Sequence, residues 1–338
     1  MNTALLKQMI SENYVRVNKH PLYDLHIYNY TAKAQYDRVW NEITLSCRGL
    51  ILDGNDQIVA RPFVKFFNLG EIPDMQLPNL PFEVFDKLDG SLGILYWINE
   101  TPFIASRGSF SSEQSDRANQ ILNEKYSNSF SLLDKNKTYV FEIIYPENRI
   151  VVDYGSEEKL VLLAIVDTQS GAEFPLEDIG FPIVERYDGI QDVDLLKALN
   201  HDNKEGFIIK FSNDFRVKIK FEEYLRLHKI VTQVSTLSIW EYLKTNQSME
   251  EILERVPDEF FDWVKQTKVD LETQFLEIEN QCKSDFKVLD SVKETALYFQ
   301  TCTFPSVLFS MMHERDYSEI IWKKIKPKFE KPFANSEE

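Results

Sequence analysis

The sequence has 338 residues, of which 43% are hydrophobic and 27% charged, and its formal net charge is -16. This composition is typical of a globular protein, and the length allows two domains. The acidic balance argues against a broad surface for polyanions, so an anionic ligand would have to meet local clusters of lysine.

Membrane and secretion signals are missing from the sequence. The longest apolar run, residues 160–166, is far too short to cross a bilayer, and residues 1–14 lack the apolar segment of a signal peptide. We therefore expect no membrane partner and a cytoplasmic location, in the host-cell cytoplasm if the protein is viral. The sequence gives no indication of the oligomeric state.

Cysteine and histidine chemistry has no support. Three cysteines, Cys47, Cys282 and Cys302, lie far apart without the spacing of a zinc knuckle or a disulfide framework. The five histidines are scattered and show no metal-binding or triad pattern.

Short β-rich runs separated by Gly, Asn, Asp and Pro dominate residues 45–220, and the clearest helical segment among them is 111–128. Such a density of strands predicts antiparallel sheets with one or two helices, hence an α+β fold. The runs are GLILDG, QIVARPFVKFF, FEVFDKL, LGILYWI, PFIASRG, TYVFEIIY, RIVVDY, KLVLLAIV, EGFIIKFS and FRVKIKF.

The pattern becomes helical after residue 221. Ser248 and Glu251 have the spacing of a capping box, and Pro257 is expected to end that helix. From residue 258 onward, apolar residues recur on one face of a long helix: Phe260, Val264, Leu271, Phe275 and Ile278. We predict an α+β domain over residues 1–235 and an all-helical C-terminal domain over residues 236–338.

Lys87 lies in the segment KLDGS, between two strand-like apolar runs. One interpretation is a solvated hairpin corner in which Gly90 takes a positive φ, and the other is a covalent nucleophile. The pattern Lys-x-Asp-Gly is weak when it stands alone, so the choice depends on the lysines and carboxylates elsewhere in the chain.

Lys218 and Lys220 are two residues apart in the run VKIK, so both side chains leave one face of a strand. Such a face is either a solvated edge or a pair of fixed cations that lower the pKa of a third lysine and bind an anion. Glu142 and Glu205 occupy strand positions where they could hold ribose hydroxyls or a metal. This set suits attack of a lysine amine on the α-phosphorus of a nucleoside triphosphate.

Seven segments together resemble one family, the RNA ligase 1 family typified by T-even phages, which belongs to the covalent nucleotidyltransferases. The resemblance covers roughly residues 20–235. The segments are YNY at 28–30, CRGLILD at 47–53, RPFVKFFNLGE at 61–71, KLDGSLG at 87–93, SRGSFSSEQ at 106–114, PENRIVVDY at 146–154 and EEYLRLHKIV at 222–231.

The resemblance implies an antiparallel-sheet nucleotidyltransferase domain, similar to the ATP-grasp ligases, in which Lys87 takes the AMP. It implies that Lys218 and Lys220 contact the phosphates and that Glu142 and Glu205 serve ribose or metal. Arg107 departs from the family pattern, which has lysine at this position. Arginine keeps the positive charge, but its guanidinium is wider than the ammonium group of lysine. The other implied nucleotide contacts are Arg48 and Lys65 at the β and γ phosphates, and Tyr28, Phe67, Gly90 and Gly206 at the pocket.

Purely structural roles remain as alternatives for several of these residues. Phe67 and Tyr28 could be core residues, and Arg48 could pair with Asp53. The pair Glu250 and Glu251 suits helix capping better than a metal.

The resemblance further implies an ATP-dependent RNA ligase with magnesium, or manganese in its place, as cofactor. Lys87 attacks ATP, AMP passes to a 5′-phosphate end, and a 3′-hydroxyl expels AMP. The expected substrate is single-stranded or broken-loop RNA such as a cleaved tRNA, with an end-healing kinase or phosphatase as a partner. A ligase for nicked duplexes and a catalytically silent RNA-binding module are the alternatives. The lysine-rich segment KKIKPKFEK is either an RNA contact or a solvated tail.

Overall fold

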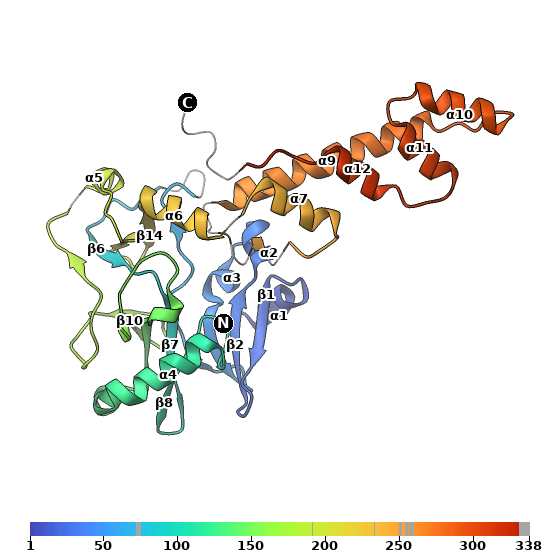
Figure 1. Ribbon diagram of the computed structural model, residues 1–338. Coiled ribbons are helices and arrows are strands. Elements are labelled where there is room, and N and C mark those ends of the chain that lie inside the picture. Colours follow the sequence, from blue (N-terminus) through green and yellow to red (C-terminus); the bar gives the residue numbers. More distant parts are fainter. Residues whose placement is uncertain are drawn as a thin grey trace. The chain divides into compact units, whose positions relative to one another are not determined.

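The computed structural model describes residues 1–71, 76–190, 192–232, 234–249, 252, 253, 256 and 260–330. The chain divides into two compact units, Met1–Val231 and Thr232–Glu338, and each is described by itself (Figure 1). The first unit is built on three sheets and the second on helices, which confirms the predicted α+β fold followed by a helical region.

The first sheet is antiparallel with the order β1-β2-β3-β4. One of its faces is covered by α1 and α3, through a cluster that includes Leu6, Ile43 and Leu50. The sequence missed β1 and β2, which precede residue 45. The elements are α1 (Thr3–Ser11), β1 (Val15–Lys19), β2 (Leu25–Tyr30), α2 (Ala32–Tyr36), α3 (Glu42–Ser46), β3 (Arg48–Asp53) and β4 (Ile58–Ala60).

The second sheet has the order β11-β10-β9-β7-β8 and lies between two layers. Ala118, Ile121 and Leu122 of α4 pack on one face, and the first sheet packs on the other through Ile27 and Ile51. The predicted helix over 111–128 is confirmed as α4, which Ser112 caps. The elements are β7 (Ser91–Ile98), β8 (Thr101–Ser106), α4 (Glu113–Tyr126), β9 (Lys137–Ile144), β10 (Lys159–Asp167) and β11 (Glu173–Phe174). Two 3-10 turns follow α4 and β9, at Ser127–Leu132 and Pro146–Asn148.

The third sheet has the order β12-β6-β13-β14-β5, and its β14–β5 pair is parallel while the others are antiparallel. Its core includes Val84, Phe207, Ile209 and Val217. The elements are β5 (Phe67–Asn68), β6 (Phe82–Lys87), β12 (Arg186–Tyr187), α5 (Val193–Ala198), β13 (Gly206–Phe211), β14 (Arg216–Lys220) and α6 (Glu222–Thr232).

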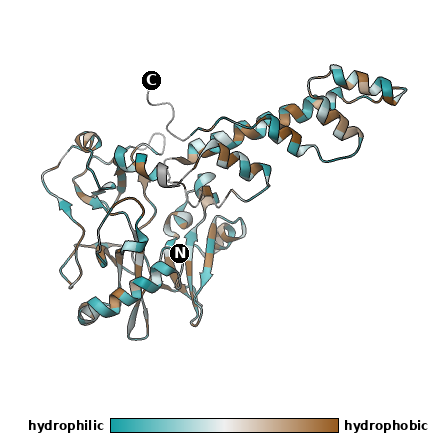
Figure 2. Ribbon diagram, viewed as in Figure 1, coloured by the Kyte–Doolittle hydropathy of each residue, from teal (hydrophilic) through white to brown (hydrophobic). Residues whose placement is uncertain are grey.

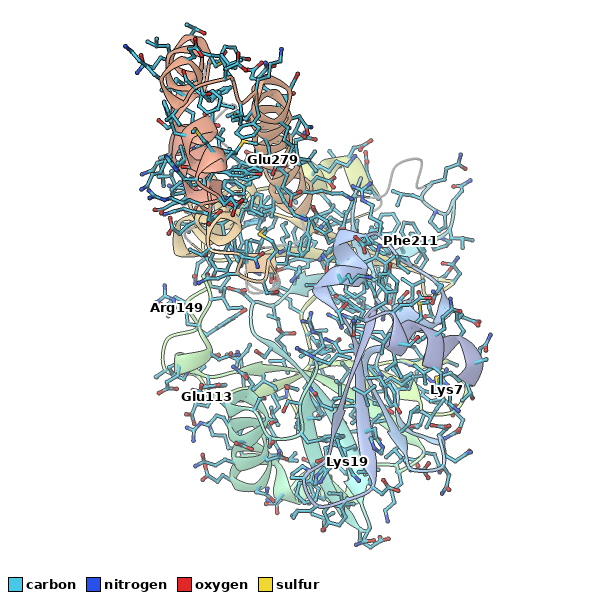
Figure 3. All side chains as sticks on the ribbon, turned by 90° about the vertical axis from the view of Figure 1, so that its right-hand side faces the viewer. Lys7, Lys19, Glu113, Arg149, Phe211 and Glu279 are labelled. Atoms are coloured by element: carbon cyan, nitrogen blue, oxygen red, sulfur yellow. The ribbon has the colours of Figure 1, made fainter. Side chains whose placement is uncertain are left out.

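The predicted strand RIVVDY at 149–154 is wrong, because this segment forms no strand in the structure. The backbone N–H groups of Val151 and Val152 donate to the Asp89 carboxylate, at 2.8 and 2.9 Å, instead of to a neighbouring strand. Arg149, which is labelled in Figure 3, lies at the start of the segment. Its guanidinium pairs with the Asp153 carboxylate at 2.7 Å.

The second unit contains five helices among its described residues, and each carries both apolar and polar residues (Figure 2). Cys282, Phe299, Leu308 and Ile321 form its core. Glu279 of α9 accepts a hydrogen bond from the Tyr317 hydroxyl. The helices are α7 (Thr236–Lys244), α9 (Phe261–Asp285), α10 (Val292–Thr301), α11 (Pro305–Met312) and α12 (Ser318–Lys324).

The long helix predicted from residue 258 is confirmed as α9, with Val264 and Leu271 buried as its periodicity requires. Glu250 and Glu251, for which the sequence favoured helix capping over a metal, and Pro257, the expected helix end, lie outside the described residues. None of the described helices combines the length and the apolar character needed to span a membrane.

Candidate active site around Lys87

Lys87 is the last residue of β6, and the register of the third sheet brings it close to Lys220. Gly206, the first residue of β13, pairs with Lys87 on one side and with Lys220 on the other. The two lysines therefore flank one strand at the same end of the sheet. Lys218 leaves the same face of β14 as Lys220 and pairs with Ile208 and with Asn68 of β5.

Glu205 links the two lysines. Its Oε1 atom lies 2.6 Å from Lys87 Nζ and 3.3 Å from Lys220 Nζ, and the whole residue is 3% exposed. Two ammonium groups thus share one buried carboxylate, which satisfies the requirement that a buried charge be paired. In this ligand-free arrangement the Lys87 side chain is paired with Glu205.

Gly206 must be a glycine for this geometry. Its φ is +153°, and a Cβ atom built on it would lie 1.9 Å from the Ile219 carbonyl oxygen. Any side chain would force β13 away from β14 and would separate Glu205 from Lys220. The close packing of β13 on β14 therefore requires a glycine after Glu205.

Gly90 permits a second close approach, between the loop after Lys87 and β9. Its N–H donates to Glu142 Oε1 at 2.9 Å, and a Cβ atom would lie 2.6 Å from the Ile143 carbonyl oxygen. The hairpin interpretation with a positive φ at Gly90 is wrong, because Gly90 is not among the glycines with positive φ. The structure shows Gly90 packed against Glu142, and its place in a nucleotide pocket stays a prediction.

Glu142 completes a cluster of opposite charges with Lys87, Glu205 and Arg48. Burial raises the pKa of the Glu142 carboxyl to about 8, and the negative charge of Glu205 adds to the rise, while Lys87 and Arg48 act against it. Glu142 is therefore mostly protonated at neutral pH in the ligand-free protein. Binding of a cation there would release its proton.

Replacing Glu142 by Gln is expected to stabilise the ligand-free protein at about pH 9 and to leave its stability unchanged near pH 4. The folded-state pKa of about 8 exceeds the ordinary 4.5, so the folded protein binds more protons between these values and loses stability as the pH rises through them. The upper limit of the gain is on the order of 5 kcal/mol. Thermal melting across this pH range measures it.

The control for this experiment is Glu147→Gln, which changes an exposed glutamate just beyond β9. It should melt like the wild-type protein at every pH. A Glu142→Gln protein whose melting temperature follows the wild-type pH profile would contradict the raised pKa.

Asp89 links the loop after Lys87 to distant parts of the chain by hydrogen bonds, a structural role that the sequence did not predict. Besides the two N–H groups of Val151 and Val152, its carboxylate accepts a hydrogen bond from the Tyr224 hydroxyl at 2.8 Å. The Asp89 N–H donates to the Tyr154 hydroxyl at 2.8 Å. Asp89 is 3% exposed, so it ties the loop after Lys87 to two distant segments. The aspartate of the Lys-x-Asp-Gly segment was the only sequence signal.

Arg48 begins β3, and its guanidinium carbon lies 5.1 Å from the Phe63 ring centre and 5.6 Å from that of Phe66. The alternative pairing with Asp53 is wrong, because Asp53 stands at the other end of β3, where it accepts hydrogen bonds from Asn55 and Gln57. Arg48 instead lies near enough to Glu142 to lower its pKa.

Lys65 is buried among aromatic rings. Its Nζ atom lies 5.1 Å from the Phe67 ring centre and 5.5 Å from those of Tyr30 and Trp40, and the residue is 4% exposed. Arg107 lies 5.6 Å from the same Tyr30 ring. Phe67 pairs with Val217 of β14, which brings this group to the strand of Lys218 and Lys220.

Tyr28 lies elsewhere. It is 7% exposed and belongs to the hydrophobic cluster of Leu6, Cys47 and Leu50 beneath the first sheet. The structure shows Tyr28 packed in this cluster, and its implied nucleotide contact stays a prediction. It places Tyr30 next to Lys65 and Arg107. The sequence missed Tyr30 and Trp40.

The described residues hold no group of three or more His, Cys, Asp or Glu side chains that could bind a metal ion by themselves. Two carboxylates, Glu142 and Glu205, adjoin Lys87. This donor set suits a cation that takes its other ligands from a phosphate and from water, as magnesium does.

The fold thus gathers a paired lysine, two carboxylates and further cations in one region of the first unit. The family model described as RNA ligase matches residues 46–225, which include every residue of this cluster. The chain therefore belongs to the RNA ligase family, and the resemblance found in the sequence is confirmed.

Individual relatives carry similar names. A putative RNA ligase of Thermovibrio ammonificans is 28% identical over 62% of this chain and 59% of its own length. A putative bifunctional polynucleotide kinase/RNA ligase of Autographa californica nuclear polyhedrosis virus is 25% identical over 75% of this chain and 40% of its own. An RNA ligase of Rhodothermus phage RM378 is 23% identical over 79% and 76%. The matched part of this chain thus spans little more than half the length of the Thermovibrio ammonificans protein.

Among solved structures, the RNA ligase of Naegleria gruberi, as a mutant with ATP and Mn, is similar to part of the chain. It covers 44% of this chain and 51% of its own, at 21% identity and a TM-score of 0.37.

Proposed function

We propose that this protein is an ATP-dependent RNA ligase that joins a 5′-phosphate to a 3′-hydroxyl through a lysyl-AMP. The observation that carries the proposal is the pairing of Lys87 with Glu205 and Lys220 within the segment that matches the RNA ligase family. One partly exposed amine beside a second cation and two carboxylates suits nucleophilic attack on a phosphate better than it suits a structural ion pair.

In the proposed first step the Lys87 amine attacks the α-phosphorus of ATP. Lys87 first gives one proton to water and becomes a neutral amine; a nitrogen–phosphorus bond then forms, the bond from the α-phosphorus to the oxygen that bridges to the β-phosphate breaks, pyrophosphate leaves, and a second proton passes from the nitrogen to water. Lys220 and Lys218 neutralise charge on the phosphates, and Arg48, Lys65 and Arg107 receive the pyrophosphate portion. Lys87 must first leave Glu205, so we propose that Glu205 turns from the lysine to the ribose or the metal when ATP binds.

Magnesium, or manganese in its place, would bind near Glu142 and Glu205 and neutralise phosphate charge. Asp89 holds the loop of Lys87, and Gly206 and Gly90 allow the close contacts already described. The later steps pass AMP to an RNA 5′-phosphate and then displace it by a 3′-hydroxyl, so no further nucleophile of the protein is needed.

The proposed substrate is single-stranded or broken-loop RNA, such as a tRNA cleaved in its anticodon loop. An enzyme that heals RNA ends would supply the 5′-phosphate and 3′-hydroxyl. The viral relative named as a kinase and ligase in one protein supports such a partner.

The test is a panel of 5′-phosphorylated RNAs, comprising a single strand, an anticodon-nicked tRNA and a nicked duplex, with DNA versions of each. Incubation with ATP and magnesium should give circles from the single strand and joined product from the tRNA, separated by size. Sealing of the nicked duplexes alone would replace the proposal by a duplex ligase. Binding without sealing or AMP gain would point to a silent RNA-binding module.

The second unit is proposed to contact the RNA through its lysine-rich segment. Residues 323–329 contain four exposed lysines and no acidic residue: Lys323, Lys324, Lys326 and Lys328. Hydrogen bonds of 2.9 Å in both directions between Thr236 and Glu330 fix the segment against the start of α7. Lys326 and Lys244 both lie over the Trp240 ring, at 5.3 and 5.1 Å.

Charge reversal at Lys326 and Lys328 is expected to weaken RNA binding and to reduce its salt dependence, by about 0.7 in the logarithmic slope for each lost contact to a single strand. Fluorescence anisotropy with a labelled RNA at several salt concentrations measures both. The matched control reverses Lys287 and Lys293, which are also exposed in this unit. Equal slopes for the two double variants would remove the RNA contact from the lysine-rich segment.

A further inference from the structure

Trp40 joins the rings around Lys65 into a continuous box. Its ring meets Tyr30 edge-on at 5.3 Å between centres and meets Phe67 edge-on at 5.2 Å. All three rings lie within 5.5 Å of Lys65 Nζ. Trp40 stands between α2 and α3, outside every segment on which the family resemblance rests.

The aromatic box stabilises the positive charge of the buried Lys65 side chain. An ammonium group that is 4% exposed loses most of its hydration, and aromatic ring faces are the apolar surroundings that compensate a cation best, with tryptophan the strongest. The Lys65 N–H is fixed by a 2.8 Å hydrogen bond to the Leu45 carbonyl of α3. Backbone and side chain are thus both anchored to the segment that carries Trp40.

A second predicted phosphate ligand depends on the same box. The Arg107 guanidinium carbon lies 5.6 Å from the Tyr30 ring centre, and Trp40 holds that ring from its edge. Trp40 therefore acts on Lys65 and Arg107, two of the three cations that the proposed mechanism places at the departing pyrophosphate.

We propose that Trp40 is a positioning residue for pyrophosphate departure, which it serves by fixing the aromatic box of Tyr30, Trp40 and Phe67 around Lys65. This inference rests on the proposed function. Trp40 itself contacts neither substrate nor reacting atoms. Its contribution is confined to the step in which ATP reacts, because pyrophosphate has left before the RNA is adenylylated and sealed.

The test separates the two halves of the reaction in the full-length protein. Trp40→Leu should slow lysyl-AMP formation from ATP about tenfold, as expected for the loss of a desolvated cation–π contact. Sealing of a pre-adenylylated RNA should stay at the wild-type rate. Trp40→Phe keeps a ring and should restore most of the first step. Equal loss in both steps would show that Trp40 only supports the fold, and would overturn the inference.

The matched control is Trp97→Leu. Trp97 also carries a lysine over its ring, with Lys135 Nζ at 5.3 Å, but it packs against the core between α4 and the second sheet. Thermal melting compares the two variants for stability, and the Trp97 variant should show no selective loss of the first step.

Ligand binding gives a readout that does not need catalysis. Calorimetry with inorganic pyrophosphate and magnesium should show about tenfold weaker binding to Trp40→Leu than to wild type, whereas binding of AMP should be equal. Unchanged pyrophosphate binding would overturn the role of Trp40. A wild-type protein that binds both ligands but gains no AMP would overturn the proposed function instead.

Discussion

Lys87→Arg is expected to give a folded protein that gains no AMP when it is incubated with ATP and magnesium, while the wild-type protein gains one. Arginine keeps the positive charge that pairs with Glu205 in the structure. Its guanidinium does not lose a proton under these conditions, however, so it cannot act as a nucleophile. Mass spectrometry of the intact protein measures the covalent AMP.

The matched control is Lys204→Arg. Lys204 precedes Glu205 and lies 3.4 Å from the carboxylate of Asp86, whose side chain leaves β6 on the face opposite to that of Lys87. This variant should still gain AMP. Lys87→Arg should in turn seal a pre-adenylylated RNA, because that reaction needs no lysine nucleophile. An AMP on the Lys87→Arg protein, or none on the wild type, would refute the assignment of the nucleophile.

Alternation and turn residues in the sequence predicted most strands of the sheets correctly, but not how those strands pair. Lys87 and Lys220 flank Gly206 because β6, β13 and β14 pair in one particular register. In the sequence, β6 lies more than a hundred residues before the other two strands. A one-residue shift would send one of the lysines to the opposite face. The sequence could therefore suggest that these lysines cooperate, but only the pairing shows Glu205 between them.

Local patterns also could not distinguish Tyr28 from Tyr30. Both leave the same face of β2, so alternation treats them alike. Tyr28 lies where α1 and the first sheet close over it, whereas Tyr30 ends the strand and meets Trp40. Asp89 was missed for a related reason, since its partners at 151, 152 and 224 are brought to it only by the fold.

Glu173→Ala is expected to destabilise the protein by about 3 to 5 kcal/mol, which corresponds to roughly 10 °C in melting temperature. Glu173 lies in β11, the edge strand of the second sheet. Both terminal nitrogens of Arg216, in the third sheet, donate hydrogen bonds of 2.5 Å to the Glu173 carboxylate. Lys210 Nζ, in the same sheet, lies 2.9 Å from that carboxylate. The Glu173 side chain is only 6% exposed. Its removal would take the bidentate carboxylate from the largely buried Arg216 and leave Lys210 with the more exposed Asp214.

Glu83→Ala is the control, since it breaks a cross-strand pair with Arg186 whose side chains are 48% and 51% exposed. Such a pair contributes less than about 1 kcal/mol. A loss of stability at Glu173 as small as that at Glu83 would show that the buried triad does not hold the two sheets together.

The same triad gives a pH signature. Burial acts to raise the pKa of Glu173, but the hydrogen bonds and charges of Arg216 and Lys210 outweigh it and leave that pKa below its ordinary 4.5. A carboxylate with a lowered pKa stabilises the folded state fully above its unfolded value and loses this effect as the pH falls through the folded value. The gap between wild type and Glu173→Ala should therefore be constant at neutral pH and should narrow below about pH 4.5. Because Arg216 and Lys210 lie on the two strands that carry Lys220 and Gly206, acid would loosen the frame of the site along with the fold.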